Sequence, residues 1–246
     1  MSLEALRGLV ARLRSDCPWD RQQDALSMRP YLMEELFEAL EAIDRQDPVA
    51  IQEELGDLLF QIFFHARLAE EKGDFDIEKV AAGITEKMIQ RHPHVFADPS
   101  LPGGPGVWEA RKAARRKGSR VDGVPRDLPA LLRAHRVGEK VAHVGFDWPD
   151  REGVFNKLRE EEAELREALE SGDPERIRHE YGDFLLAASS LGRHIGVSGE
   201  DALREANARF EGRFRKVEHL AEAAGVPLEQ AGAEALDRWW QEAKRT

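Results

Sequence analysis

Two groups of carboxylates recur in this sequence with the same internal spacing. Each group combines Glu-x-x-Glu on one predicted helix with Glu-x-x-Asp on the next. Residues at i and i+3 share one face of a helix and lie about 5–6 Å apart at Cβ. Two helices joined by a short turn can therefore present all four carboxylates to one another. The first quartet is Glu35, Glu38, Glu54 and Asp57, and the second quartet is Glu161, Glu164, Glu180 and Asp183.

Four clustered carboxylates repel one another unless a cation lies between them. Oxygen ligands favour hard divalent cations, so each quartet predicts a site for Mg²⁺, with Mn²⁺ as a substitute. A solvated acidic face would give the same pattern on one isolated helix. Gly56 and Gly182 favour the metal site, because a glycine inside a helix costs about 1 kcal/mol relative to alanine. A bare backbone there would let another group approach closely.

The first quartet also lies beside an apolar stripe formed by Leu55, Leu58 and Ile62. Because Glu54 and Asp57 flank this stripe, we expect both carboxylates to be partly desolvated.

Redox iron is a different chemistry for acidic helical bundles. Di-iron bundles use Glu-x-x-His on their inner faces, and this sequence has no such motif. His65 and His179 lie near the quartets at other spacings, so we interpret them as ordinary core or surface residues.

The quartets belong to an internal duplication. A shift of 126 residues places 31–67 over 157–193 without a gap, and 14 of the 37 positions are identical. Seven of these pairs are carboxylates, a larger share than preservation of a core alone would predict. The sequence therefore predicts a tandem repeat of helical units of about 120 residues each.

Basic and aromatic residues follow each quartet. A pair of cations at i and i+4 could bind phosphate oxygens, although a solvated basic face would look the same. Farther on, Trp-x-x-x-Lys recurs, and its ring could stack on a base while the lysine meets a phosphate. The residues are Lys87, Arg91, Trp108 and Lys112 in the first half, and Arg209, Arg213, Trp240 and Lys244 in the second.

The elements that position these residues are predicted to be helices. Val, Ile and Thr together make up only 24 of 246 residues, whereas Ala, Leu, Glu and Arg dominate, so we expect an all-α fold. Asp47 before Pro48 and Asp173 before Pro174 predict two helix starts. Pro and Gly are frequent near the middle of the chain. We expect helical domains over 1–118 and 129–246, with a linker over 119–128.

The composition excludes several classes of protein. A formal net charge of −11 argues against binding to nucleic acid polymers. The single Cys17 excludes an intrachain disulfide and suits a reducing cytoplasm. No apolar stretch approaches the roughly 20 residues that span a bilayer, so we expect no membrane contact.

Several motifs, in the right order over nearly the whole chain, resemble the MazG family of nucleoside triphosphate pyrophosphohydrolases. Besides the quartets, they are CPWD (17–20), RHPHVFAD (91–98), VGFDW (144–148) and FEGRFRKVEH (210–219). The resemblance implies an all-α fold whose four-helix-bundle cores are completed in a homodimer. It also implies Mg²⁺-dependent hydrolysis of NTPs and dNTPs to the monophosphate and pyrophosphate, with a role in maintaining the nucleotide pool.

Carried over by position, the resemblance assigns the metal ligands to Glu161, Glu164, Glu180 and Asp183. The nucleotide-binding positions of the family are matched by Arg213, Trp240 and Lys244. At the position of Arg209 the family often has lysine. Glu161 or Glu164 would orient or deprotonate water, with the downstream cations completing the catalytic group. We favour the second quartet as the working site because Lys157 lies one turn before Glu161, where the first repeat has Tyr31. Because the first quartet is also complete, the possibility of a second working site stays open.

Two other hypotheses remain at this point. One is a related all-α pyrophosphohydrolase dedicated to a single substrate such as dUTP or phosphoribosyl-ATP. The other is a helical interaction module whose acidic faces bind proteins and need no metal. The segment Cys17–Asp20 could be a structural staple or a pocket lid.

Overall fold

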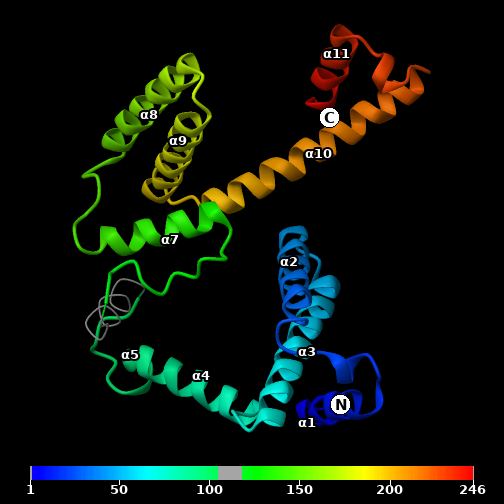
Figure 1. The fold of residues 1–246 in the computed structure, drawn as a ribbon, viewed down its shortest axis with the longest axis vertical. Coiled ribbons are helices and arrows are strands. Elements are labelled where there is room, and N and C mark those ends of the chain that lie inside the picture. The colour runs from blue at the N-terminus through cyan, green and yellow to red at the C-terminus, as the bar shows by residue number, and fades with distance from the viewer. Residues whose placement is uncertain (1, 105–117, 246) are drawn as a thin grey trace. The chain divides into compact units, whose positions relative to one another are not determined.

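The computed structural model describes residues 2–104 and 118–245 (Figure 1). All regular elements in these two ranges are helices, which confirms the all-α prediction. None of the described helices is long and apolar enough to cross a membrane. The chain divides into two compact units, residues 1–109 and 110–246. The division falls outside the described residues, and the expected boundaries at 118 and 129 stay a prediction.

Unit 1 is built around a pair of helices that carries the first quartet. Gln46 is left-handed with φ 54° and ends the first helix of this pair, and Asp47 begins the second by accepting from the backbone N–H groups of Val49 and Ala50. The predicted Asp47 cap is thus confirmed. The helices are α1 (Leu3–Asp16), α2 (Arg29–Arg45), α3 (Pro48–Lys72), α4 (Ile77–Arg91) and α5 (Pro93–Phe96), with a 3₁₀ turn, η1, at Asp20–Gln22.

The core of unit 1 forms where α1 packs against the C-terminal half of α3. Its buried residues are Val10, Met28, Phe63, Phe64 and Leu68. All three α3 residues lie beyond the quartet, toward the end of the helix, so the apolar core and the acidic residues occupy different parts of α3. The contacts with α1 therefore lie toward the C-terminal end of α3, away from the quartet.

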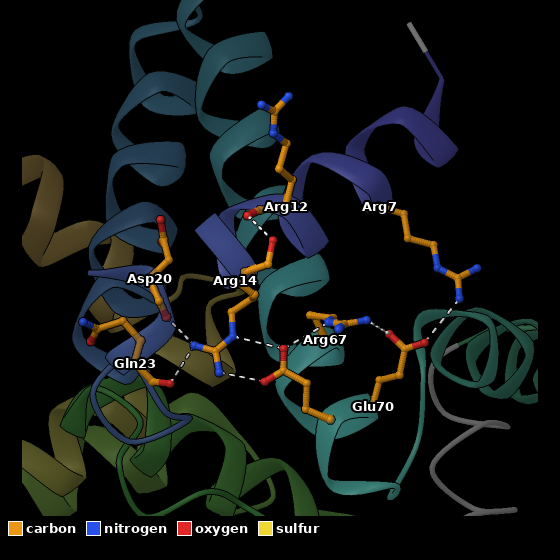
Figure 2. A network of polar contacts seen from close by, with 9 residues as sticks. Arg7, Arg12, Arg14, Asp20, Gln23, Arg67 and Glu70 are labelled. Carbon is orange, nitrogen blue, oxygen red and sulfur yellow. Dashed lines mark hydrogen bonds and ion pairs between the residues drawn. The ribbon is translucent and has the colours of Figure 1, made fainter. Parts of the chain in front are cut away.

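An arginine network fastens the segment Cys17–Asp20 to the end of α3 (Figure 2). Arg14 donates to the backbone carbonyls of Asp20 and Gln23 and pairs with Glu71 at 2.7 Å. Arg67 donates to the same Glu71 carboxylate at 3.0 Å. These contacts favour the structural-staple interpretation of the segment over the lid.

Unit 2 contains the second pair of helices and a long helix that leads to the C-terminal end. Asp173 caps α9 by accepting from the N–H groups of Glu175 and Arg176, as predicted. A second core joins α10 to α11 through Val217, Ala221, Trp239 and Ala243. The helices are α7 (Ala130–Ala142), α8 (Arg151–Ser171), α9 (Pro174–His194), α10 (Gly199–Ala223) and α11 (Ala233–Ala243), with a 3₁₀ turn, η2, at Leu228–Gln230.

Asp147 of the VGFDW motif anchors the loop before α8 to the end of α9. It accepts from Arg193 at 2.6 Å and from His194 at 3.0 Å. Trp148 packs edgewise on His194. Arg193 occupies the repeat position of Arg67. Arg193 contacts the preceding loop directly through Asp147, whereas Arg67 pairs with Glu71 of its own helix, and Arg14 makes the contact with the preceding segment.

We expect Asp147→Asn to lower the free energy of unfolding at pH 7 by about 1–3 kcal/mol. The hydrogen bonds from Arg193, followed by that from His194, hold the Asp147 pKa well below its usual range. Because the folded pKa is the lower one, the stabilisation is complete above the unfolded pKa of about 3.9 and is lost as pH falls. Unfolding by urea at pH 7 and pH 3 measures this difference. Glu211→Gln, at an exposed site on α10, is the control. A destabilisation that is the same at both pH values would contradict the assignment.

Candidate metal centre

The second quartet lies on facing sides of α8 and α9. Carboxylate oxygens of Glu161, Glu164 and Glu180 lie within 4.8 Å of one another. Glu161 is only 4% exposed, and its Oε2 atom has no hydrogen-bond partner. A buried carboxylate oxygen without a partner is costly. The burial of Glu161 does not fit a solvated acidic face, because this carboxylate faces α9.

Asp183 belongs to a neighbouring group that includes a residue the sequence interpretation set aside. His179 Nδ1 lies 3.2 Å from Asp183 Oδ2 and 3.8 Å from Glu180 Oε1. These three residues also place possible ligand atoms within 4.8 Å of one another. Glu180 thus joins Asp183 to the other two carboxylates. The i,i+4 spacing of His179 and Asp183 was the signal that could have placed the histidine here.

Lys157 pairs with the second quartet. Its Nζ lies 2.7 Å from Glu161 Oε1 and 2.6 Å from Glu160 Oε1. The hydrogen bonds to Glu160 and Glu161 raise the pKa of Lys157 above its ordinary range, so the amine is charged at neutral pH. The structure therefore brings Lys157 to the most buried member of the quartet, with Glu161 Oε2 still open.

The first quartet repeats the arrangement on α2 and α3 with less burial. Oxygens of Glu35, Glu38 and Glu54 lie within 4.8 Å of one another. Burial, followed by the charge of Asp57, raises the pKa of Glu35. Burial, followed by the charges of Glu38 and Asp57, raises the pKa of Glu54. The charge of Asp57 thus raises the pKa of both residues, although Asp57 is not part of the group of three whose oxygens lie within 4.8 Å.

Gln61 is a second residue that the sequence interpretation missed. Gln61 is 3% exposed and lies on the same face of α3 as Glu54. It donates a hydrogen bond to Glu35. Its carbonyl oxygen is buried without a hydrogen-bond partner. The repeat position in unit 2 is Ala187, which is also buried.

Two of the three residues in the apolar stripe expected beside the first quartet are exposed, and Leu58 is half-buried. Leu55 and Ile62 are 52% and 45% exposed, so they do not desolvate the carboxylates within the chain. Glu54 is half-buried, as expected, and Asp57 is exposed. A Cβ added at Gly56 or Gly182 would meet no atom within 4 Å. The chain itself thus makes no close approach at either glycine.

The downstream residues of unit 2 form a separate group. The Trp240 ring packs on Phe210 with a centroid distance of 5.2 Å, and Lys244 Nζ lies 5.7 Å from the Trp240 ring centre. Arg209, on α10, pairs with Glu205 at 3.5 Å, and Arg213 lies on the same helix. Among the described residues, no hydrogen bond, ion pair or ring contact joins this group to the second quartet.

Unit 1 shows only part of the corresponding set. Lys87 and Arg91 both lie on α4, where Lys87 is exposed and Arg91 is half-buried. Trp108 and Lys112 lie outside the described residues.

The two quartets suit a hard divalent cation. Each quartet offers at least three carboxylate oxygens that lie within 4.8 Å of one another, and it offers no thiolate. Glu161 and Gln61 each have a buried oxygen without a hydrogen-bond partner, and a bound cation or its water would supply that partner. His179 adds one nitrogen donor to the second quartet and none to the first.

Comparisons with known proteins agree on one family. Residues 23–96, which contain the first quartet, match the MazG nucleotide pyrophosphohydrolase domain. The chain is 43% identical to the nucleoside triphosphate pyrophosphohydrolase/pyrophosphatase MazG of Thermotoga maritima, covering 98% of this chain and 95% of the relative. It is 40% identical to the nucleoside triphosphate pyrophosphohydrolase of Escherichia coli K12, covering 99% and 97%. The uncharacterized protein YabN of Bacillus subtilis is 39% identical over 98% of this chain and 51% of its own length.

We expect Glu54→Gln to raise the melting temperature of the metal-free chain at pH 7. A raised carboxyl pKa means that the folded state disfavours the charged form. The destabilisation is therefore present above the folded pKa and disappears as pH falls through it, toward about pH 4. Thermal unfolding in EDTA at several pH values measures the effect. Glu34→Gln, at an exposed site on α2, is the control. A lower melting temperature for Glu54→Gln at pH 7 would contradict the repulsion argument.

Proposed function

This chain belongs to the MazG family of nucleoside triphosphate pyrophosphohydrolases, and from that premise we propose that it hydrolyses NTPs and dNTPs with Mg²⁺. Water is added across the bond between the α- and β-phosphates, giving the nucleoside monophosphate and pyrophosphate. The observation that supports the second quartet as the working site is the partnerless, buried Oε2 of Glu161, grouped with Glu164 and Glu180 beside Lys157.

Glu161, Glu164, Glu180 and Asp183 would hold Mg²⁺, or Mn²⁺ in its place. When bound, the metal would neutralise and orient phosphate oxygens. Glu161 or Glu164 would orient the attacking water and accept its proton, since carboxylates near a reacting centre can act as bases. The first quartet, which lies inside the matched family domain, is proposed as a second metal site.

The nucleotide would be bound by the chain's own cations and one ring. Lys157, Arg209 and Arg213 would bind phosphate oxygens, since a lysine offers a point charge and an arginine a planar fork. Trp240 would stack on the base, and Lys244, already beside the Trp240 ring, would contact a phosphate. No Gly-rich phosphate loop is present in the sequence, so these side chains must take its place.

A homodimer would explain two features of the chain. The Trp240 group is not joined to the quartet within one copy, so a second copy would bring the two together. Large apolar side chains on the helix pairs and on α10 are also at least one-third exposed, and such faces need a further helical layer to cover them. They are Leu36, Phe37, Leu55, Ile62, Tyr181, Leu185, Leu186, Leu203 and Phe210.

The cellular role that fits this chemistry is maintenance of the nucleotide pool in the cytoplasm. In this proposal 1–118 and 129–246 are MazG-like domains joined by 119–128. The chain would act on small nucleotides rather than on a nucleic acid polymer.

We expect Glu161→Gln and Asp183→Asn each to reduce Mg²⁺-dependent pyrophosphate release by more than about a hundredfold, because even outer partners of a metal ligand cost 10–100-fold. The circular dichroism spectrum should be unchanged. The assay is pyrophosphate release over a panel of NTPs and dNTPs, with and without Mg²⁺. Glu162→Gln, on the exposed side of the same helix, is the matched control.

Glu35→Gln tests the first quartet in the same assay and should cost less than Glu161→Gln. Turnover reduced only to about half by each variant would show two independent working sites. Wild-type turnover by Glu161→Gln, or pyrophosphate release without any divalent cation, would contradict the proposed function. Turnover of one nucleotide alone would indicate a dedicated enzyme.

We expect the chain to be a dimer at micromolar concentration, with a mass twice the 27.8 kDa of one copy. The uncovered apolar faces supply the driving force. Static light scattering across a dilution series measures the mass. Leu186→Glu, on an exposed face of α9, should shift the chain toward the monomer, whereas Glu162→Gln should not. A mass of one copy throughout would contradict the dimer.

A further inference from the structure

The two quartets share their four carboxylates but differ in the residues beside them. Lys157 stands one turn before Glu161, and the repeat position before Glu35 is Tyr31. Gln61 is buried against Glu35, and its repeat position is Ala187. The duplication has therefore kept the ligand set and changed the charge next to it.

In the second quartet, an ammonium group already neutralises the most buried carboxylate. Lys157 Nζ lies 2.7 Å from Glu161 Oε1, and the Lys157 side chain is one-third exposed. Opposite charges at this distance attract strongly when one of them is buried. Glu161 Oε2 remains buried without a partner, which marks a place for a further positive or donating group.

In the first quartet, a neutral residue takes the place of that ammonium. The Tyr31 ring packs edgewise on Trp19 with a centroid distance of 5.8 Å. The adjacent neutral group is the Gln61 amide, whose carbonyl oxygen is also buried without a partner. A cation that enters this quartet meets carboxylates and an amide oxygen, and no lysine at the position of Lys157.

We propose that Lys157 is a positioning residue that competes with divalent metal for Glu161 until a nucleotide draws it away. This rests on the proposed function, which places metal in both quartets. Free metal then binds the first quartet more tightly than the second. A triphosphate offers Lys157 other oxygens, and Glu161 is released toward the metal. Metal and nucleotide therefore bind cooperatively at the second quartet and independently at the first.

The first test isolates the second quartet in the full chain by Glu54→Gln, which disables the first. Free Mn²⁺ is measured by electron paramagnetic resonance, with and without an α,β-methylene nucleoside triphosphate. In this background, we expect Lys157→Met to bind Mn²⁺ at least about fivefold more tightly without nucleotide, the lower end of typical couplings between linked sites. The enhancement of Mn²⁺ binding by nucleotide should be lost. Arg159→Met is the control, because Arg159 lies on the same helix and pairs with Glu152 away from the quartet.

The reciprocal test transfers the lysine. In a chain whose second quartet is disabled by Glu180→Gln, Tyr31→Lys should weaken Mn²⁺ binding by a similar factor. Tyr31→Met removes the contact with Trp19 without adding a charge and should bind Mn²⁺ as the background does. Equal weakening by both Tyr31 variants would show that the ring contact, and not the charge, sets the affinity, and would overturn the inference.

The outcomes separate the inference from the function on which it rests. No Mn²⁺ binding by the unmodified chain, with or without nucleotide, would overturn the proposed function and the inference together. Equal Mn²⁺ affinity with and without Lys157, and an intact nucleotide enhancement in Lys157→Met, would overturn the inference alone. Tighter binding with lost enhancement supports it.

Discussion

Repulsion among carboxylates held face to face by two closely linked helices is the constraint on which this molecule depends. Burial is greatest at Glu161, which has one oxygen on Lys157 and the other without a partner. A chain under no functional demand would place such residues on the solvent side of the helix, where they cost little. The same unfavourable arrangement occurs twice in one chain, which supports the proposal that both helix pairs bind a cation.

The helix pairs can carry this repulsion because each is fixed at its two ends. At the turn, Asp47 and Asp173 cap the second helix in the same way, so the offset between the two helices is set alike in both repeats. At the opposite end, Arg14 links the preceding segment to Glu71 of α3, and Asp147 links the preceding loop to Arg193 of α9. The acidic residues lie between these fixed points, where their spacing follows from helix geometry alone.

Each unit is also incomplete as a helical bundle. The cores join α1 to α3 and α10 to α11, and neither core covers the outer faces of the α2–α3 and α8–α9 pairs. Exposed leucines and the open space at Gly56 and Gly182 belong to these uncovered faces. Apolar surface of this kind is stabilised by further burial. The proposed homodimer would also explain the separation of the Trp240 group from the quartet, since a site shared between copies needs parts from both.

The sequence by itself determined the helical class and both aspartate caps, and it predicted the duplication and the residues of each quartet, because these follow from local propensity and from spacing along one helix. Tertiary structure decided which members are buried. A helical wheel cannot say which side of an amphipathic helix meets its neighbour in the same chain and which is left for another layer, so Leu55 and Ile62 were expected inside and lie outside. The roles of Gln61 and His179 depend on packing between helices rather than on any motif, and only the folded chain places them beside the carboxylates.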